Sequence, residues 1–305
     1  MNLQNPKKFK MLVDQAHEVA LHVLRPVSRK YDKAEHAYPK ELDMLASLVD
    51  GMNEGGESMN AGAAGAGNRS ESDNEGNRNG TNMSTALSII EMCYGDTGLL
   101  LSMPRQGLGN SAIAAVANDE QLERFKGTWA AMAITESGCG SDSAAIRTTA
   151  IKDGDDYILN GEKIFVTSGE RADSVVVWAT LDKKLGRAAI KSFVVPKGTE
   201  GMKVERLEHK LGIKASDTAV ISFIDCRVPA ANLLGNAEVD VAKGFAGVME
   251  TFDNTRPLVA AMAIGCAKAS LERIKEIFKD QLDADYKIWL HKFTVWKLNG
   301  KLHVY

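Results

Sequence analysis

The sequence predicts an α+β protein of several domains, because the spacing of its apolar residues changes twice along the chain. A period near 3.6 residues in the first third indicates helices, a period of 2 in the middle indicates strands, and the helical period returns near Val241. The middle strands follow one another closely without helices between them, which favours an antiparallel sheet or small barrel over a doubly wound sheet. We expect an N-terminal helical domain at residues 1–128, a central β domain at 129–240 and a partial C-terminal helical bundle at 241–305.

The first helices are predicted at residues 8–49, where apolar residues recur every three to four positions. Proline disfavours the helix interior, so we expect a break near Pro26 and a second helix after Pro39. Helical spacing resumes at Met83, and Asn118 or Asp119 is placed to cap a short helix.

Residues 51–82 are rich in Gly, Asn and Ser, and their only large apolar residues are Met52 and Met59. Such a segment buries too little apolar surface to offset the entropy lost on ordering, so we expect a flexible loop. A lid over a pocket is the less favoured alternative, because the segment has neither aromatic residues nor a cluster of cations.

The central β region is marked by short alternating segments separated by turn residues. A D-G pair at Asp153 and an N-G pair at Asn160 predict hairpin turns, since both pairs tolerate positive φ angles. The predicted strands are the sequences AMAIT, SVVVWATL, KSFVVP, MKVERL and TAVISFIDCRVP, in that order along the chain.

Composition excludes several classes of function. The chain has 305 residues, 44% of them apolar, a net charge of -3 and a pI of about 6.1, which predicts no nucleic-acid or membrane partner. No apolar run reaches the roughly 20 residues that span a bilayer, and the N-terminus lacks a signal-peptide pattern, so we expect a cytoplasmic protein. The four cysteines and six histidines show no ligand spacing, which predicts neither disulfides nor a metal site.

The segment AITESGCGSD at residues 133–142 poses the functional question. A dinucleotide loop lies between a strand and a helix, and a P-loop has a lysine after its last glycine. Here Ser141 and Asp142 follow Gly140, and strands come next, so both standard phosphate loops are excluded. Two readings stay open: a tight turn with capping hydroxyls, or a turn that holds a polar cofactor through its N–H groups and hydroxyls.

Four motifs in order carry a resemblance: AITESGCGSD, LNGEKIFVTSGERAD, KLGIKASDTAVISFIDCRVPAANLLG and KGFAGVMETFDNTRPLVAAMAIGCAKASLE. Over about residues 85–278 the chain resembles the acyl-CoA dehydrogenase family of flavoproteins. The resemblance implies helical, β and helical domains, an FAD cofactor and an acyl-CoA substrate. It also implies a role in lipid metabolism, an electron-transfer flavoprotein as partner, and a homo- or hetero-oligomer.

The resemblance also implies roles for individual residues. Contacts to FAD are expected from Met132, Ile134, Thr135, Ser141, Phe165, Val166 and Thr167, and contacts to acyl-CoA from Ser141, Ser216, Asp253 and Arg256. Family members often have tryptophan at the position of Phe165, and packing within the sheet is the simpler role for this side chain. The simpler role for Asp253 and Arg256 is a solvated ion pair between residues three apart on a helix.

The implied reaction is α,β-dehydrogenation, in which a carboxylate removes the α-proton of the thioester while the β-hydrogen leaves as hydride. Family members place this glutamate either far downstream or just before the arginine matching Arg256, where this chain has Thr255. The sequence ends at Tyr305, so no catalytic residue is assigned. We expect a C-terminally truncated or frame-shifted chain; a second chain that supplies the base is the alternative. A non-catalytic flavin- or CoA-binding subunit and another flavin reaction also stay open.

Overall fold

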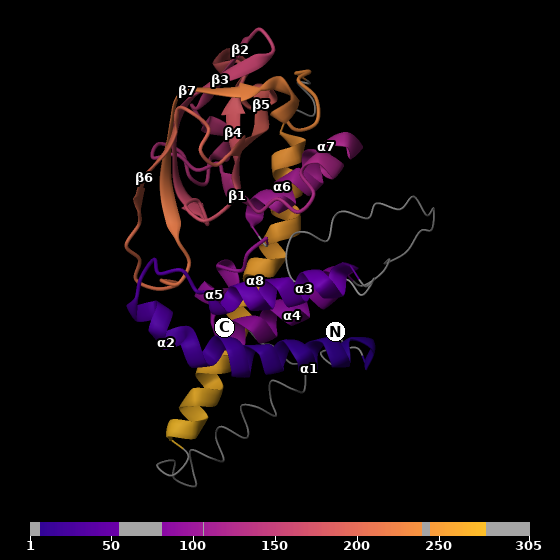
Figure 1. Cartoon of the computed structure of the whole chain (residues 1–305), viewed down its shortest axis with the longest axis vertical. Coiled ribbons are helices and arrows are strands. Elements are labelled where there is room, and N and C mark those ends of the chain that lie inside the picture. Colours follow the sequence, from indigo (N-terminus) through magenta and orange to yellow (C-terminus); the bar gives the residue numbers. More distant parts are fainter. Residues whose placement is uncertain (1–6, 55–80, 106, 240–244, 279–305) are drawn as a thin grey trace, which may run out of the picture.

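The computed structural model describes residues 7–54, 81–105, 107–239 and 245–278. A layer of helices lies at one end of the molecule, a β-sheet lies at the other, and one long helix runs from the sheet through the helical layer (Figure 1). The described helices are α1 (Lys10–Val19), α2 (Arg25–Lys33), α3 (Glu41–Glu54), α4 (Thr81–Gly95), α5 (Thr97–Leu101), α6 (Leu108–Val116), α7 (Asp119–Arg124) and α8 (Ala246–Ile277). This arrangement confirms the predicted order of helical, β and helical parts.

The break expected near Pro26 is wrong, because α1 continues into α2 through one wider turn. Residues Ala20–Leu24 form a π-helical turn, in which the backbone N–H of Arg25 donates to Ala20 O, and the backbone at both ends of the turn is right-handed helical. In a regular α-helix the proline ring would clash with the carbonyl four residues earlier. We attribute the unbroken path to the wider turn, which changes the backbone just before the ring.

The other helix signals are confirmed. A helix follows Pro39, and Asn118 caps α7 through a capping box with Gln121, in which each side chain accepts a hydrogen bond from the other residue's backbone N–H. The segment expected to be a loop at residues 51–82 is helical at both ends, within α3 and α4, and its residues 55–80 lie outside the described part of the chain.

The described strands form one sheet in the order β1-β4-β2-β3-β7-β6, with β5 paired to β4. The strands are β1 (Ala130–Ala133), β2 (Thr149–Asp153), β3 (Asp156–Thr167), β4 (Ser174–Thr180), β5 (Ile190–Pro196), β6 (Met202–Leu207) and β7 (Thr218–Pro229). Most neighbours are antiparallel as expected, but β4 pairs in parallel with β1 and, at one residue pair, with β2. The sheet is therefore mixed, because β1 and β4 are joined by a long crossover that contains β2 and β3.

Of the two predicted turns, only the first is a hairpin. Gly154, with a φ of 61°, lies in the turn between β2 and β3, whereas Gly161 lies inside the continuous strand β3. There the pairing with β7 shifts by a bulge, the φ of Gly161 is 154°, and a Cβ atom would lie 2.8 Å from Thr148 Cα. The N-G pair thus lies inside a strand, opposite an extra residue on β7 between Phe223 and Cys226, at a point where two backbones come close together, and it makes no turn.

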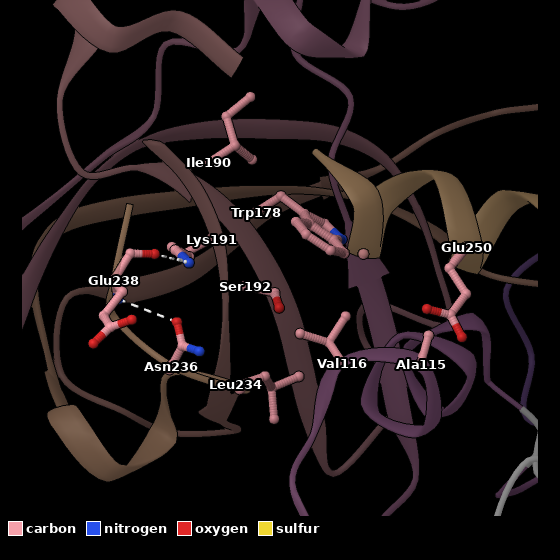
Figure 2. A pocket seen from close by; sticks show the side chains of 12 residues that line it. Ala115, Val116, Trp178, Ile190, Lys191, Ser192, Leu234, Asn236, Glu238 and Glu250 are labelled. Carbon is pink, nitrogen blue, oxygen red and sulfur yellow. Dashed lines mark hydrogen bonds between the residues drawn. The ribbon is translucent and has the colours of Figure 1, made fainter. Parts of the chain in front are cut away.

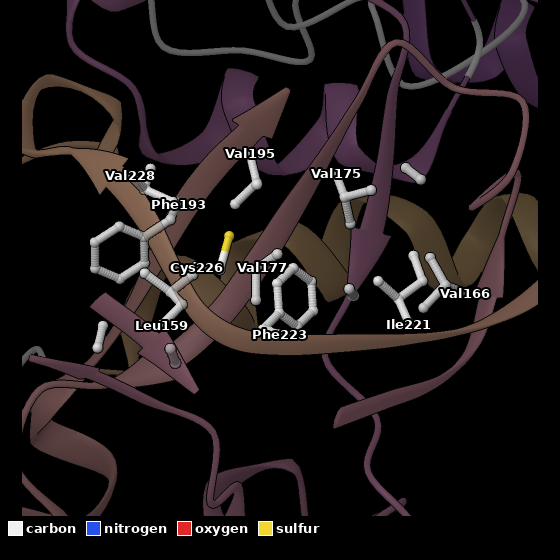
Figure 3. Packing of buried hydrophobic residues seen from close by; sticks show 14 of the residues in the cluster. Leu159, Val166, Val175, Val177, Phe193, Val195, Ile221, Phe223, Cys226 and Val228 are labelled. Atoms are coloured by element: carbon white, nitrogen blue, oxygen red, sulfur yellow. The ribbon is translucent and has the colours of Figure 1, made fainter. Parts of the chain in front are cut away.

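Three buried clusters hold these layers together. The central cluster fills the inner face of the sheet; Figure 3 shows its members Leu159, Val166, Val175, Val177, Phe193, Val195, Ile221, Phe223, Cys226 and Val228. A second cluster lies among α1–α5 and includes Ala261 of α8. The third joins β4 and β5 to α6 and to the first turns of α8, with Trp178 and Ile134 among its members. The opposite faces of the sheet therefore belong to different cores.

Helix α8 contacts both the sheet and the helical layer. A Cβ atom on Gly265 would overlap the carbonyl oxygen of Ile90 on α4 and lie 2.8 Å from Cys93 Cβ, so only glycine permits this crossing. Beyond the crossing, large apolar side chains are exposed, among them Leu271, Ile274 and Ile277. None of the described helices is long and apolar enough to span a membrane.

Candidate functional site

The glycine-containing segment after β1 forms a tight turn. Glu136 and Cys139 exchange backbone hydrogen bonds of 3.1 Å in both directions, so Ser137 and Gly138 form the tip of the turn. A Cβ atom on Gly138 or Gly140 would meet no protein atom within 4 Å. The turn therefore borders open space, where a ligand could approach the backbone.

A buried ion pair holds this turn from behind. Lys163 Nζ on β3 lies 2.7 Å from Glu136 Oε1 and donates to the carbonyl of Ile134 at 3.1 Å. Glu136 also accepts from the backbone N–H groups of Arg147 and Thr148 and from Thr148 Oγ1, at 2.6 to 2.9 Å. One carboxylate thus fixes three segments of the β region: the turn, the start of β2 and the middle of β3.

Charge on this pair is set by two opposing effects. Burial raises the pKa of the Glu136 carboxyl, but the charge and hydrogen bond of Lys163 and the hydrogen bonds from Thr148 outweigh it, so the net pKa lies below its ordinary value. Burial lowers the pKa of Lys163, and Glu136 counteracts only part of this. We infer that the carboxylate is ionised at neutral pH and that the lysine neutralises its charge.

Sequence reasoning missed this pair, although a signal was present. Along β3 the side chains of Tyr157 and Leu159 are buried, and Lys163 lies in phase with them at 0% exposure. A lysine at an inward-facing strand position is rare unless it has a partner. The alternation of β3 therefore indicated a buried ion pair, and the sequence did not identify which carboxylate it contains.

Phe165 lies on the bulge of β3 between Lys163 and Val166 and is held in an unusual conformation. Its φ is 57°, in the left-handed region that bulky residues rarely adopt, and its side chain is 60% exposed. The preceding residue, Ile164, donates its backbone N–H to Thr135 O at 2.9 Å, so the bulge adjoins the tight turn. Exposure of this aromatic ring rules out simple packing within the sheet, and a strained, exposed side chain indicates a functional position.

Three of the predicted site residues offer unpaired hydroxyl groups. Among the described residues, the side chains of Thr135, Ser141 and Thr167 have no hydrogen-bond partner. Thr135 and Thr167 are half-buried, and Ser141 is exposed. Together with the Phe165 ring and the half-buried Met132, they provide an aromatic face and several donors, which suits a flat, polar ligand.

Other predicted residues are less accessible. The Val166 side chain is 0% exposed and belongs to the central cluster, so only its backbone could face a ligand. Ile134 is buried, and its carbonyl accepts the bond from Lys163. Ser216 is 1% exposed, and its hydroxyl donates to the carbonyl of Asp217 at 3.4 Å, so a ligand would reach it only after local rearrangement.

Asp253 and Arg256 form an ion pair with each other on α8, and both side chains are 64% exposed. This is the solvated ion pair between residues three apart on a helix that was expected as the simpler role of these two side chains. Phe252 beside them packs against the cluster that contains Ile134, which places this part of α8 on the same side of the sheet as the turn. Thr255 is buried and donates to Thr251 O at 3.0 Å, so its hydroxyl satisfies the helix backbone.

A cavity of about 330 Å³ lies between β4, β5, α6 and the start of α8. Figure 2 shows Trp178 and Ser192 at its centre, with Glu250 on one side and Glu238 on the other. The indole N–H of Trp178 and the hydroxyl of Ser192 are buried and have no hydrogen-bond partner among the described residues. None of the site residues predicted from the sequence lines this cavity.

Comparison with known proteins identifies the fold family. A family model described as "Acyl-CoA dehydrogenase, middle domain" matches residues 131–226, the region of the sheet. An acryloyl-CoA reductase (NADH) of Anaerotignum propionicum is 33% identical over 287 residues, which are 89% of this chain and 66% of the relative.

Solved structures agree with this match. The butyryl-CoA dehydrogenase of Megasphaera elsdenii superposes with a TM-score of 0.75 at 29% identity, over 93% of this chain and 72% of that one. A chain from the study of the electron transferring flavoprotein of Acidaminococcus fermentans gives a TM-score of 0.74 at 31% identity, over 93% and 71%. The match to this chain spans between 40% and 66% of the length of six curated relatives. By sequence and by fold, the chain belongs to the acyl-CoA dehydrogenase family.

Proposed function

We propose that this chain binds FAD against the turn after β1 and the Phe165 bulge, and that it serves the α,β-dehydrogenation of an acyl-CoA thioester. The observation that carries the proposal is Phe165 itself, an exposed aromatic ring with a φ of 57° that follows Ile164, the residue bonded to Thr135. An exposed ring at a strained position is costly, and contact with a flat ligand gives it a role.

The residues present fit a flavin. The space beside Gly138 and Gly140 admits a ligand to the backbone, and the free hydroxyls of Thr135 and Thr167 can donate to ring atoms. Bound FAD would supply hydride acceptance. The chain's own contribution is orientation: Lys163 and Glu136 fix the turn that carries Thr135, and the bulge fixes the aromatic face.

The substrate side is less complete. Dehydrogenation needs a carboxylate at the α-carbon of the thioester, and Thr255, at one family position for it, is buried and bonded within its own helix. This observation favours a second candidate function, a non-catalytic subunit that binds flavin or CoA. The proposal also includes acyl-CoA contacts through Ser141, Asp253 and Arg256. It further includes an electron-transfer flavoprotein as partner and assembly into an oligomer.

An absorption spectrum of the purified protein tests both functions. The proposal expects bound flavin that bleaches under anaerobic addition of butyryl-CoA, octanoyl-CoA or palmitoyl-CoA. Bound flavin that none of these thioesters bleaches, but that dithionite does, supports the non-catalytic subunit. Protein that neither purifies with flavin nor binds added FAD contradicts the dehydrogenase and the flavin-binding subunit, and leaves only a subunit that binds CoA.

A further inference from the structure

A cluster of two imidazoles and one carboxylate lies where the N-terminal helices meet the sheet region. Glu35 and His36 follow α2, and His209 follows β6; their ligand atoms all lie within 4.8 Å of one another. Glu35 and His209 are 174 positions apart in sequence, which is why the spacing of histidines gave no sign of them. The fold alone brings the three side chains together.

Glu35 is held in place by two contacts at its two oxygens. Its Oε1 accepts the backbone N–H of Lys210 at 2.9 Å, and its Oε2 lies 3.0 Å from His209 Nδ1. Both oxygens of the carboxylate are therefore oriented by the segment that follows β6.

His36 is the residue that the protein alone does not explain. Both of its ring nitrogens are buried, and neither has a hydrogen-bond partner among the described residues. Its φ is 68°, and Arg171 fixes the segment by donating to the carbonyls of His36 and Ala37 at 3.2 and 3.0 Å. An unpaired buried imidazole is costly unless a water or an ion satisfies it.

Nearby cations are engaged elsewhere. Lys210 Nζ donates to Ser216 O and to Thr218 Oγ1, and Arg171 Nε lies 3.4 Å from Asp217 Oδ1. Arg171 thus bridges the His36 segment and Asp217, and both cations already have partners other than the three candidate ligand side chains.

The geometry points to a binding site for one divalent transition-metal ion, Zn²⁺ foremost, with Glu35, His36 and His209 as ligands. Two imidazoles and one carboxylate form a common zinc set that leaves a fourth position for water. Mg²⁺ and Ca²⁺, which require oxygen ligands, would not be held. A bound ion would join the segment between α2 and α3 to the segment after β6.

The test is zinc binding by the full chain after treatment with a chelator, measured by calorimetry and by metal content. We expect one tightly bound Zn²⁺ per chain and no heat with Mg²⁺. Ligand removal is tested with His209→Ala and with His36→Asn, since asparagine tolerates the positive φ at position 36. Each variant should lower the Zn²⁺ affinity by at least about 10-fold, since loss of a residue that merely supports a ligand already costs about 10- to 100-fold.

His22→Ala is the matched control. His22 also pairs with a carboxylate, its Nε2 lying 3.1 Å from Glu18 Oε2, but both side chains are mostly exposed and have no third ligand. This control should bind Zn²⁺ like the unaltered chain. The site is overturned if the chelated protein takes up no zinc, or if His209→Ala binds it as tightly as His22→Ala does. His209 is 85% exposed, so its removal leaves the fold intact and the comparison decisive.

Discussion

The inner face of the sheet and the outer face of α8 carry similar side chains in opposite environments. The sheet encloses Leu159, Phe193 and Ile221 at 0% exposure, whereas α8 leaves Leu271 47% and Ile277 52% exposed. The sheet region also buries a charged pair, while the pair of Arg273 and Glu276 on α8 lies in solvent. The difference teaches that the sheet region is complete within the described residues, whereas α8 has a second apolar face that these residues do not cover.

The largest expected effect comes from breaking the buried pair. Lys163→Met leaves Glu136 charged and buried, which should lower the free energy of unfolding by about 3–5 kcal/mol. Arg273→Met removes the matching member of an exposed pair with Glu276 on α8 and should cost less than about 0.5 kcal/mol. Urea denaturation measures both. Equal losses would contradict the comparison, and adding Glu136→Gln to Lys163→Met should restore part of the stability.

The same truncation can be made in both regions. Leu159→Ala creates a cavity in the central cluster and should cost about 2–5 kcal/mol. Leu271→Ala removes a half-exposed side chain and should cost less than about 1 kcal/mol, because little apolar area returns to water. Denaturation midpoints give the two values. A loss at Leu271 as large as that at Leu159 would show that another surface covers α8 in solution.

Acid should weaken the sheet region through Glu136. Its folded pKa lies below the ordinary value of 4.5, so the unfolded chain binds more protons near that pH. The stabilisation that the ionised Glu136 contributes is therefore present above pH 4.5 and is lost as the pH falls below that value. Glu136→Gln should show a shallower fall of unfolding free energy on acidification than the unaltered chain does. Parallel curves for the two proteins would mean that Glu136 does not titrate in this range.

Only a small effect on stability is expected at Phe165. Asparagine accepts a φ of 57°, so Phe165→Asn should change the free energy of unfolding by no more than about 1 kcal/mol. It should nevertheless weaken FAD binding about 10-fold, because the aromatic face is lost. Ile151→Asn is the control, since Ile151 is 61% exposed on β2 without a strained backbone. Fluorescence titration with FAD measures both variants, and equal affinities would argue against a stacking role.

Much of the fold could be predicted because the apolar periodicity of the strands is strong. The pattern located β4, β5, β6 and β7, and the D-G pair located the hairpin between β2 and β3. The sequence prediction was wrong at Pro26, where a π-helical turn lets the helix continue instead of breaking. It was also wrong at Gly161, which lies at a bulge in the strand pairing and not in a turn. Such irregularities depend on neighbours distant in sequence, such as Thr148 beside Gly161.

The candidate site was predictable only in part. The loop and the Phe165 motif could be identified from the sequence, and the structure adds the bond between Ile164 and Thr135 that joins them. The partner of Lys163 and the cluster at His36 could not be found, because both depend on contacts between segments far apart in sequence. Burial was also invisible, so Ser216 was expected at a surface from which it is hidden.

Helix α8 crosses α4 at Gly265, so a change in packing at this residue would tilt the rest of α8 about the crossing point. The end of α8 at Ala246 lies about 28 Å from it at a rise of 1.5 Å per residue, so each degree of tilt moves that end by about 0.5 Å. A methyl group at Gly265 would push on Ile90 and Cys93, and a tilt of α8 would change the contact of Gly247, near its far end, with Val116 and Trp178. A crystal structure of Gly265→Ala would reveal this swing as a displacement of Gly247, and a fixed Gly247 would mean that α4 yields instead. The lack of a side chain at Gly265 thus bears on how the distant end of α8 meets the sheet.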